Sequence, residues 1–193
     1  WYGAGSHTTA AMSGTGPYTY TITVPDDSID TLHYIFHAYD EEGNMESTSQ
    51  ADVGITDNDR PVFGTDSSVT QCTTGEYIDL EIEIMDNIGV YQVFVEYWYG
   101  SGERMNRSMT GTGPYYYTTQ VPMGMIDSFR YIFHAVDEEG NWEETAMVSI
   151  PIFDNDRPLF GHDLSDVSGT TGDQISLAIE VEDNIGVTEV YVE

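Results

Sequence analysis

The sequence predicts an all-β protein made of tandem antiparallel β-sandwich repeats of about 97 residues. One observation is a motif that occurs twice, as "DNDRPVFG" from Asp57 and as "DNDRPLFG" from Asp154. The other is a series of short β-branched and aromatic runs separated by turn signals, with no helical pattern between them. A repeat of this size with strand-like runs throughout is typical of sandwich domains arranged in series.

A single offset superimposes the repeats along the whole chain. Arg60 and Arg157 lie 97 positions apart, and the same offset carries Asp40 onto Asp137 and Pro17 onto Pro114. The 193 residues therefore provide about two periods. We expect residues 1–57 to form the C-terminal part of a split sandwich, 58–154 a complete sandwich, and 155–193 the N-terminal part of a split sandwich that the next copy completes.

The strands of the complete repeat follow in order. In "EYIDLEIEIMD" (76–86), four apolar residues alternate with acids and share one face, namely Ile78, Leu80, Ile82 and Ile84. Further strands are expected in "VYQVFVEYWY" (90–99), "PYYYTTQVP" (114–122), "SFRYIFHAVD" (128–137) and "TAMVSIPIFD" (145–154). Turn signals such as "DNIG", "TGTGP" and "DEEGN" separate them. Short strands joined by turns indicate an antiparallel sandwich.

The runs "YIFHAVD" (131–137) and "YIFHAYD" (34–40) resemble the sixth strand of immunoglobulin-like domains. In that strand a tyrosine precedes the core cysteine by two residues, and here Phe133 and Phe36 stand at the cysteine position. The resemblance implies an immunoglobulin-like sandwich without the inter-sheet disulfide. It also implies that Tyr131 and Tyr34 are corner tyrosines with hydroxyls bonded to nearby backbone. The chain is most similar to tandem repeats of prokaryotic extracellular surface proteins, which implies an extracellular, cell-surface location.

Composition excludes several classes of function. The 34 acidic residues outnumber five basic residues, all of them arginine, which gives a net charge of −29. Such a chain repels nucleic acid and anionic membrane surfaces, so we expect neither as a partner. No apolar run is long enough to span a membrane. No catalytic motif is present either, and we expect no enzyme activity.

The doubled motif also looks like the linker of cadherins, in which acidic residues, a proline and a phenylalanine join successive sandwiches around calcium. The helix-loop-helix calcium loop does not fit, because Pro61 occupies its fifth position and Val62 replaces the glycine at its sixth. A calcium site in this linker must therefore take further ligands from neighbouring loops.

Topology indicates which loops are close to the linker. The chain enters an immunoglobulin-like sandwich at the pole that carries the turns here written "MDNIGV" and "VDEEGN". The first predicted ligand set is therefore Asp57, Asp59, Asp86, Asp137 and Glu139, and the second is Asp154, Asp156, Asp183, Asp40 and Glu42. Oxygen ligands without thiols favour calcium. The alternative is that these acids only form turns, since Asp accepts backbone hydrogen bonds in such loops.

Two functions are compatible with these features. The first is a structural repeat of an extracellular filament, stalk or surface array, stiffened by calcium at the linkers. The second is an adhesin or carbohydrate-binding module that uses exposed aromatic residues of 97–99 and 115–117 and Trp142 to contact a surface glycan or a neighbouring filament. Because the loops of both repeats are nearly identical, the first function is favoured.

The predicted partners are copies of the chain itself, joined head to tail. The final residues "DNIGVTEVYVE" match "DNIGVYQVFVE", which continues into "WYGSG", and the chain opens on "WYGAG". We therefore expect the next copy to complete each partial sandwich, in a filament where Glu193 of one copy lies close to Trp1 of the next. Either a continuous polypeptide or separate complementing subunits would satisfy this expectation.

Overall fold

The computed structural model describes all 193 residues, and every regular element is a β-strand. No helix in it could cross a membrane. Tertiary contacts divide the chain into two compact units, and each is described by itself. The first unit comprises Trp1–Val62, Met85–Tyr91 and Val136–Glu143, and the second comprises Phe63–Ile84, Gln92–Ala135 and Glu144–Glu193.

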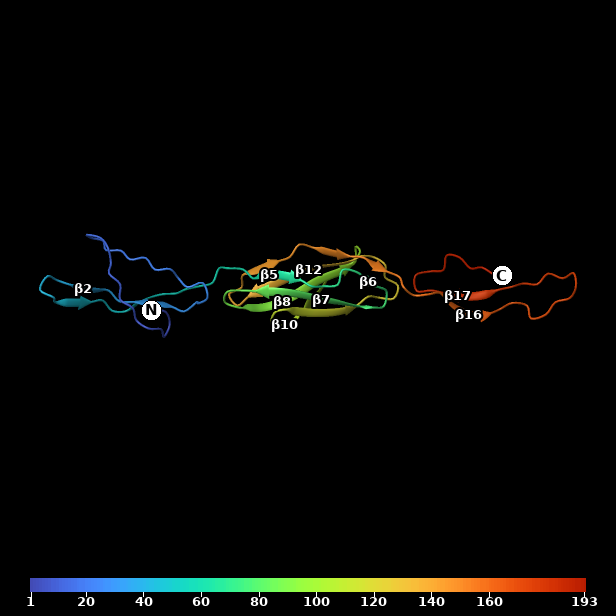
Figure 1. Ribbon diagram of the computed structural model, residues 1–193, viewed down its shortest axis with the longest axis horizontal. Helices are drawn as coiled ribbons and strands as arrows, with labels where there is room; N and C mark the ends of the chain where they lie inside the picture. Colours follow the sequence, from blue (N-terminus) through green and yellow to red (C-terminus); the bar gives the residue numbers. More distant parts are fainter. The chain divides into compact units, whose positions relative to one another are not determined.

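The strands coloured teal to orange in Figure 1 form the two sheets of a sandwich. One sheet has the order β10 (Thr110–Gly111), β11 (Tyr115–Gln120), β7 (Tyr77–Met85) and β5 (Val62–Asp66). The other has the order β13 (Trp142–Glu144), β12 (Phe129–Asp137), β8 (Val90–Tyr99) and β9 (Met105–Ser108), with β14 (Val148–Ile150) also paired to β12. These orders correspond to the two sheets of an immunoglobulin-like sandwich. The predicted fold class is confirmed.

The core follows from strict alternation along the strands. On β7 the four residues Ile78, Leu80, Ile82 and Ile84 are buried, while the acids between them are not. On β12 the buried apolar residues are Phe129, Tyr131, Phe133 and Ala135. Burying each large apolar side chain contributes about 1.5–3 kcal/mol. The two sheets are therefore held together by one continuous apolar layer.

The tyrosine at the corner position has a different partner from the one predicted. Tyr131 Oη donates a hydrogen bond to Asp66 Oδ2 on β5 over 2.8 Å, so the predicted backbone acceptor is wrong. Burial raises the pKa of Tyr131, and the bond to Asp66 raises it further. This bond links β12 to β5. Its repeat counterpart Tyr34 makes no such bond.

The predicted strand at 145–154 is divided at Pro151. Its first half is β14, and its second half, β15 (Ile152–Phe153), pairs in parallel with β6 (Cys72–Thr73). Proline cannot donate to a strand ladder, so the chain leaves one pairing and starts another at this residue. The Pro151 carbonyl accepts a hydrogen bond from Cys72 N over 3.2 Å.

The segments that precede and follow the sandwich in the sequence, coloured blue and red in Figure 1, carry only short strand pairs. In residues 1–57, β1 (Leu32–Tyr34) pairs with β4 (Ala51–Val53), and β2 (His37–Tyr39) pairs with β3 (Met45–Ser47). In residues 158–193, β16 (Leu159–Asp163) pairs with β17 (Ile179–Glu182). The register Leu32↔Val53 reproduces Phe129↔Ile150 of the sandwich at the repeat offset.

Candidate metal centre

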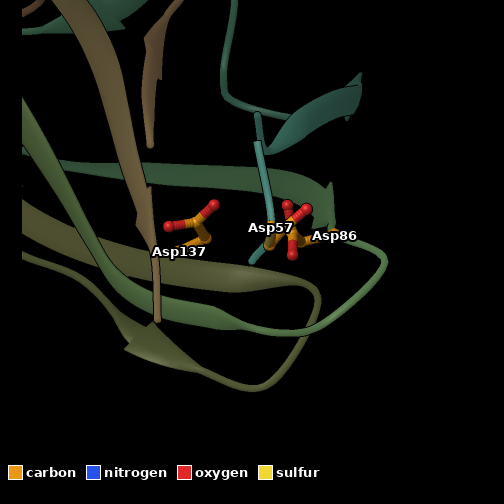
Figure 2. Close-up of side chains that lie close together, drawn as sticks. All are labelled: Asp57, Asp86 and Asp137. Carbon is orange, nitrogen blue, oxygen red and sulfur yellow. The ribbon is translucent and has the colours of Figure 1, made fainter. Parts of the chain in front are cut away.

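Three separate segments bring carboxylates together in the first unit (Figure 2). Asp57 lies in the linker before β5, Asp86 follows the last residue of β7, and Asp137 ends β12. One oxygen from each lies within 4.8 Å of the others. We call these three residues the aspartate triad. The linker and the two turns that the sequence analysis grouped therefore meet at this point.

Asp57 and Asp86 each use one oxygen to hold a loop. Asp86 Oδ1 accepts hydrogen bonds from the amides of Ile88 and Gly89 at 3.0 and 2.9 Å. Asp57 Oδ1 accepts from the amide of Asp59 at 3.1 Å. The second oxygen of each residue is buried and has no hydrogen-bond partner. Turn formation therefore accounts for the Oδ1 atoms and leaves the Oδ2 atoms for another ligand.

Asp137 is the most deeply buried member of the triad, with 1% of its surface exposed. Its Oδ1 accepts from the amides of Gly140 and Asn141 at 2.6 and 2.7 Å, and its Oδ2 accepts from Asn141 Nδ2 at 2.7 Å. Burial opposes ionisation of this carboxyl group, yet these hydrogen bonds hold its pKa below the usual value. The residue is thus a fixed, buried anion.

Two asparagines that the sequence analysis did not single out orient the linker. Asn87 Nδ2 donates to Asp57 Oδ1 at 3.2 Å and to the carbonyl of Asp26 at 2.7 Å. Asn141 Nδ2 donates to the Asp57 carbonyl at 3.3 Å. Asn87 lies in the "DNIG" turn and Asn141 in the "DEEGN" turn, so their occurrence in the two acidic turns was the available signal. They hold Asp57 against both turns.

The triad is electrostatically unfavourable unless it is neutralised. Because these oxygens lie within 4.8 Å of one another, each pair of carboxylates repels by at least about 3 kcal/mol at an effective dielectric constant of about 20. Buried charged oxygens without partners add a further penalty. Carboxylate oxygens that lie within 4.8 Å of one another, with no thiol among them, suit a single hard cation such as Ca²⁺ or Mg²⁺.

The other two acids of the first predicted set lie outside the triad. Asp59 donates its amide to Asp57 and lines a hollow of about 150 Å³ beside the linker, together with Asp26 and Asp57. Glu139 is exposed in the turn after β12. The hollow is large enough for water molecules, which could supply the remaining ligands of a cation.

The second predicted set is divided between the two units. Asp154 and Asp156 both accept a hydrogen bond from Thr74 Oγ1, at 3.1 and 3.2 Å, and Asp154 also accepts from Asn184 Nδ2 at 3.2 Å. Asp183 Oδ1 holds the amides of Ile185 and Gly186 at 3.0 Å each, as Asp86 does in its own turn. Asp40 and Glu42 belong to the first unit. Thr74 was not predicted.

Asp40 has nearly the same local structure as its repeat counterpart Asp137. Its Oδ1 and Oδ2 accept from the amide and the side chain of Asn44, both at 2.7 Å. Its pKa is lowered, first by the Asn44 side chain and then by the Asn44 amide. Unlike Asp137, it is exposed.

The arginine of the linker contacts the sandwich that follows it. Arg60 Nη1 donates to Glu143 Oε2 on β13 over 3.1 Å, in a single exposed ion pair. Because this ion pair is exposed, we expect it to contribute no more than about 1 kcal/mol.

The aromatic residues considered for ligand binding lie in different environments. Tyr97 and Trp98 are buried, and the guanidinium of Arg104 lies 4.2 Å from the centre of the Trp98 ring. Tyr116 and Trp142 are exposed. Within 97–99, the Trp98 ring offers the largest surface for stacking a sugar, and this ring is buried beneath Arg104.

Comparisons with known proteins add no assignment. No protein-family model matches the chain, and a search of curated proteins finds no significant relative.

Proposed function

We propose that the chain is a structural repeat of an extracellular filament, stalk or surface array, and that calcium at the interdomain linkers stiffens it. The observation that carries this proposal is the pair of buried, unpartnered oxygens Asp57 Oδ2 and Asp86 Oδ2 beside the buried Asp137. A divalent cation there would turn mutual repulsion into shared attraction.

The position of the triad gives the cation a mechanical role. Asp57 belongs to the linker, whereas Asp86 and Asp137 belong to turns at the ends of β7 and β12. A cation held by all three would cross-link the linker to those turns. Chelation would then remove this cross-link and leave the linker held by its hydrogen bonds alone.

A structural role is also consistent with the rest of the molecule. The net charge of −29 favours divalent cations and disfavours nucleic acid. The local hydrogen bonds of the Asp86 turn recur at Asp183, so this turn has the same structure in both repeats. Binding sites for a dedicated ligand usually differ between copies of a repeat, so this sameness favours a role common to every junction.

Calcium titration of the chelator-treated chain tests the proposal. We expect heat of binding at the triad and a higher melting temperature, since ligand at 100 times its Kd stabilises the folded state by about 2.7 kcal/mol. Asp86→Asn keeps an acceptor for the amides of Ile88 and Gly89 but removes one charge, and it should weaken binding. Glu138→Gln removes one charge from the neighbouring exposed turn and should leave binding nearly unchanged. Equal effects of both variants, or no calcium heat for the unmodified chain, would contradict a site at the triad.

A further inference from the structure

The seven asparagines of the chain divide into three repeat pairs and one single residue, Asn106. The pairs lie 97 positions apart, in turns and in the linker motif, and are Asn44 with Asn141, Asn58 with Asn155 and Asn87 with Asn184. Four of these six side chains hold a turn or a linker by hydrogen bonds. The repeat position that corresponds to Asn106 is Thr9. Asn106 therefore has no role that the two copies of the repeat share.

Asn106 lies on an exposed edge strand and has no partner for its side chain. It belongs to β9, the last strand of its sheet, and it pairs across the ladder with Glu96 of β8. Because the neighbouring Val95 is fully buried, Glu96 and Asn106 both face outward. Glu96 Oε2 accepts a hydrogen bond from Arg104 Nη1 at 2.6 Å, whereas the Asn106 side chain makes none. Asparagine is depleted in strands, so neither a contact nor local propensity explains this residue.

Asn106 begins the sequence Asn106-Arg107-Ser108, which has the form of an acceptor for N-linked glycosylation. None of the other six asparagines has a serine or threonine two positions later. Asn106 and Ser108 are two residues apart on one strand, so they face the same side of the sheet. The Ser108 hydroxyl makes no hydrogen bond in the chain either. Both polar groups of the acceptor sequence are thus free and on one surface.

We infer that Asn106 is the attachment site of an N-linked glycan. In the reaction, Asn106 Nδ2 forms a bond to the anomeric carbon of an oligosaccharide carried on a polyprenyl phosphate. The bond from that carbon to the carrier oxygen breaks, the carrier phosphate leaves with the electron pair, and the amide nitrogen loses one proton. The inference rests on the extracellular location in the proposed function, because this modification belongs to secreted chains.

A glycan at Asn106 would shield the free edge of β9. An edge strand exposes unpaired amide and carbonyl groups with which another sheet can pair. Here Arg107 Nη1 donates to the Asn106 carbonyl at 2.8 Å and so satisfies one of these groups. A bulky, hydrated glycan would hinder the approach of a second sheet along the whole strand. It would not disturb the core, because Asn106 faces away from the buried side of the sheet.

Secretion of the full chain from a cell that performs N-linked glycosylation tests the inference. We expect one glycan per chain, seen as an increase in intact mass that peptide N-glycosidase removes while converting Asn106 to aspartate. Ser108→Thr keeps the acceptor sequence and should keep the glycan. Ser108→Ala removes the hydroxyl and should abolish the modification. A secreted chain without a glycan, a glycan at another residue, or a glycan that persists in Ser108→Ala would overturn the inference.

A second measurement asks whether the closed sandwich accommodates the glycan. Cys72 is the only cysteine and is buried, so its labelling by a thiol reagent reports opening of the sandwich. We expect the glycosylated chain and the enzymatically deglycosylated chain to be labelled at rates within about twofold of each other. Labelling about tenfold faster in the glycosylated chain would overturn the placement of the glycan on folded β9.

Failure of this inference can be distinguished from failure of the calcium proposal, because glycan transfer to Asn106 needs no cation at the aspartate triad. A glycosylated chain that binds no calcium would reject only the cation role. A chain that binds calcium at the triad and is secreted without a glycan would reject only the glycan site.

Discussion

Phe133→Ala and Phe36→Ala form a matched pair of substitutions at one repeat position. Phe133 lies on β12 in the closed core, and Phe36 lies between β1 and β2 in a segment without a cover. The two residues have the same sequence neighbours, from the tyrosine two positions before to the alanine two positions after. Any difference in their effects therefore reports tertiary packing rather than local propensity.

The expected magnitudes differ widely. Phe133 is 1% exposed, so removing its ring loses the full transfer free energy and leaves a cavity, at a cost of about 3–5 kcal/mol. Phe36 is 47% exposed, so roughly half of the transfer free energy is at stake, or about 1 kcal/mol, and no closed cavity forms. In a monomeric chain, none of that loss should fall on the complete sandwich.

Cys72 provides a local assay for the complete sandwich. It is the only cysteine in the chain, and its thiol is buried beside the Pro151 carbonyl. Burial raises the pKa of this thiol, which lowers its reactivity further. If closing outruns labelling, the labelling rate reports the free energy of opening. Phe133→Ala should accelerate labelling roughly 100- to 3,000-fold, since each 1.4 kcal/mol is tenfold.

Phe36→Ala should change the same rate less than about twofold at concentrations where the chain is monomeric. A comparable acceleration by both substitutions would refute the view that residues 58–154 form a closed sandwich whose stability is independent of the Phe36 side chain. A negligible effect of Phe133→Ala would refute the core assignment itself. If Phe133→Ala fails to fold, Phe133→Leu should show a smaller acceleration in the same direction.

Two further predictions concern tyrosine hydroxyls. Tyr131→Phe removes the hydrogen bond to Asp66 and should lower the free energy of unfolding by about 1–2 kcal/mol in urea titrations. Tyr34→Phe loses no such bond and should change the free energy of unfolding by less than about 0.5 kcal/mol. Equal losses in the two variants would contradict a role for the bond. Burial, followed by the neighbouring Tyr97, raises the pKa of Tyr99 to about 12 from a usual 10.0, so the folded state keeps a proton that the unfolded chain releases. Stability should therefore be full below about pH 10 and fall as the pH rises toward 12, by up to about 1.4 kcal/mol per pH unit, and urea midpoints for Tyr99→Phe should fall less steeply.

Much of the fold could be predicted because alternation and turn chemistry agree along the complete repeat. The run 76–86 became β7 over Tyr77–Met85, and the run 90–99 became β8 over the same residues. Period-two patterning fixes which face is buried, so Ile78 and Leu80 were placed in the core by pattern alone.

The exchange of strand pairing at Pro151 was missed for a physical reason. The run 145–154 is rich in apolar residues on both sides of Pro151, so its pattern predicts one strand, although the missing amide of Pro151 ends one ladder. The partner of the second half, β6, contains only Cys72 and Thr73. A two-residue strand has no periodicity to detect.

The predicted ligand sets were grouped by strand topology, which places loops next to one another but does not place their side chains. Strand order brings the ends of β7 and β12 to the linker, and Asp57, Asp86 and Asp137 lie there together. Strand order does not give the direction of a side chain within a turn. Asp59 and Glu139 lie in those loops but contribute no oxygen to the triad. The asparagines that hold the linker are neutral, so a search for charged ligand residues does not find them.

At both linkers an asparagine side chain donates a hydrogen bond to a backbone carbonyl, so the bond does not depend on the side chain of the accepting residue. Asn87 Nδ2 donates to the carbonyl of Asp26 at 2.7 Å, and its counterpart Asn184 Nδ2 donates to the carbonyl of Met123 at 2.6 Å. An acid at one position and a thioether at the other leave the bond unchanged, because the acceptor belongs to the backbone. Asn87 and Asn184 also bond Asp57 and Asp154, each at 3.2 Å. Each linker is thus positioned by neutral donors before any cation binds, so a cation would neutralise carboxylates that are already in place instead of gathering them.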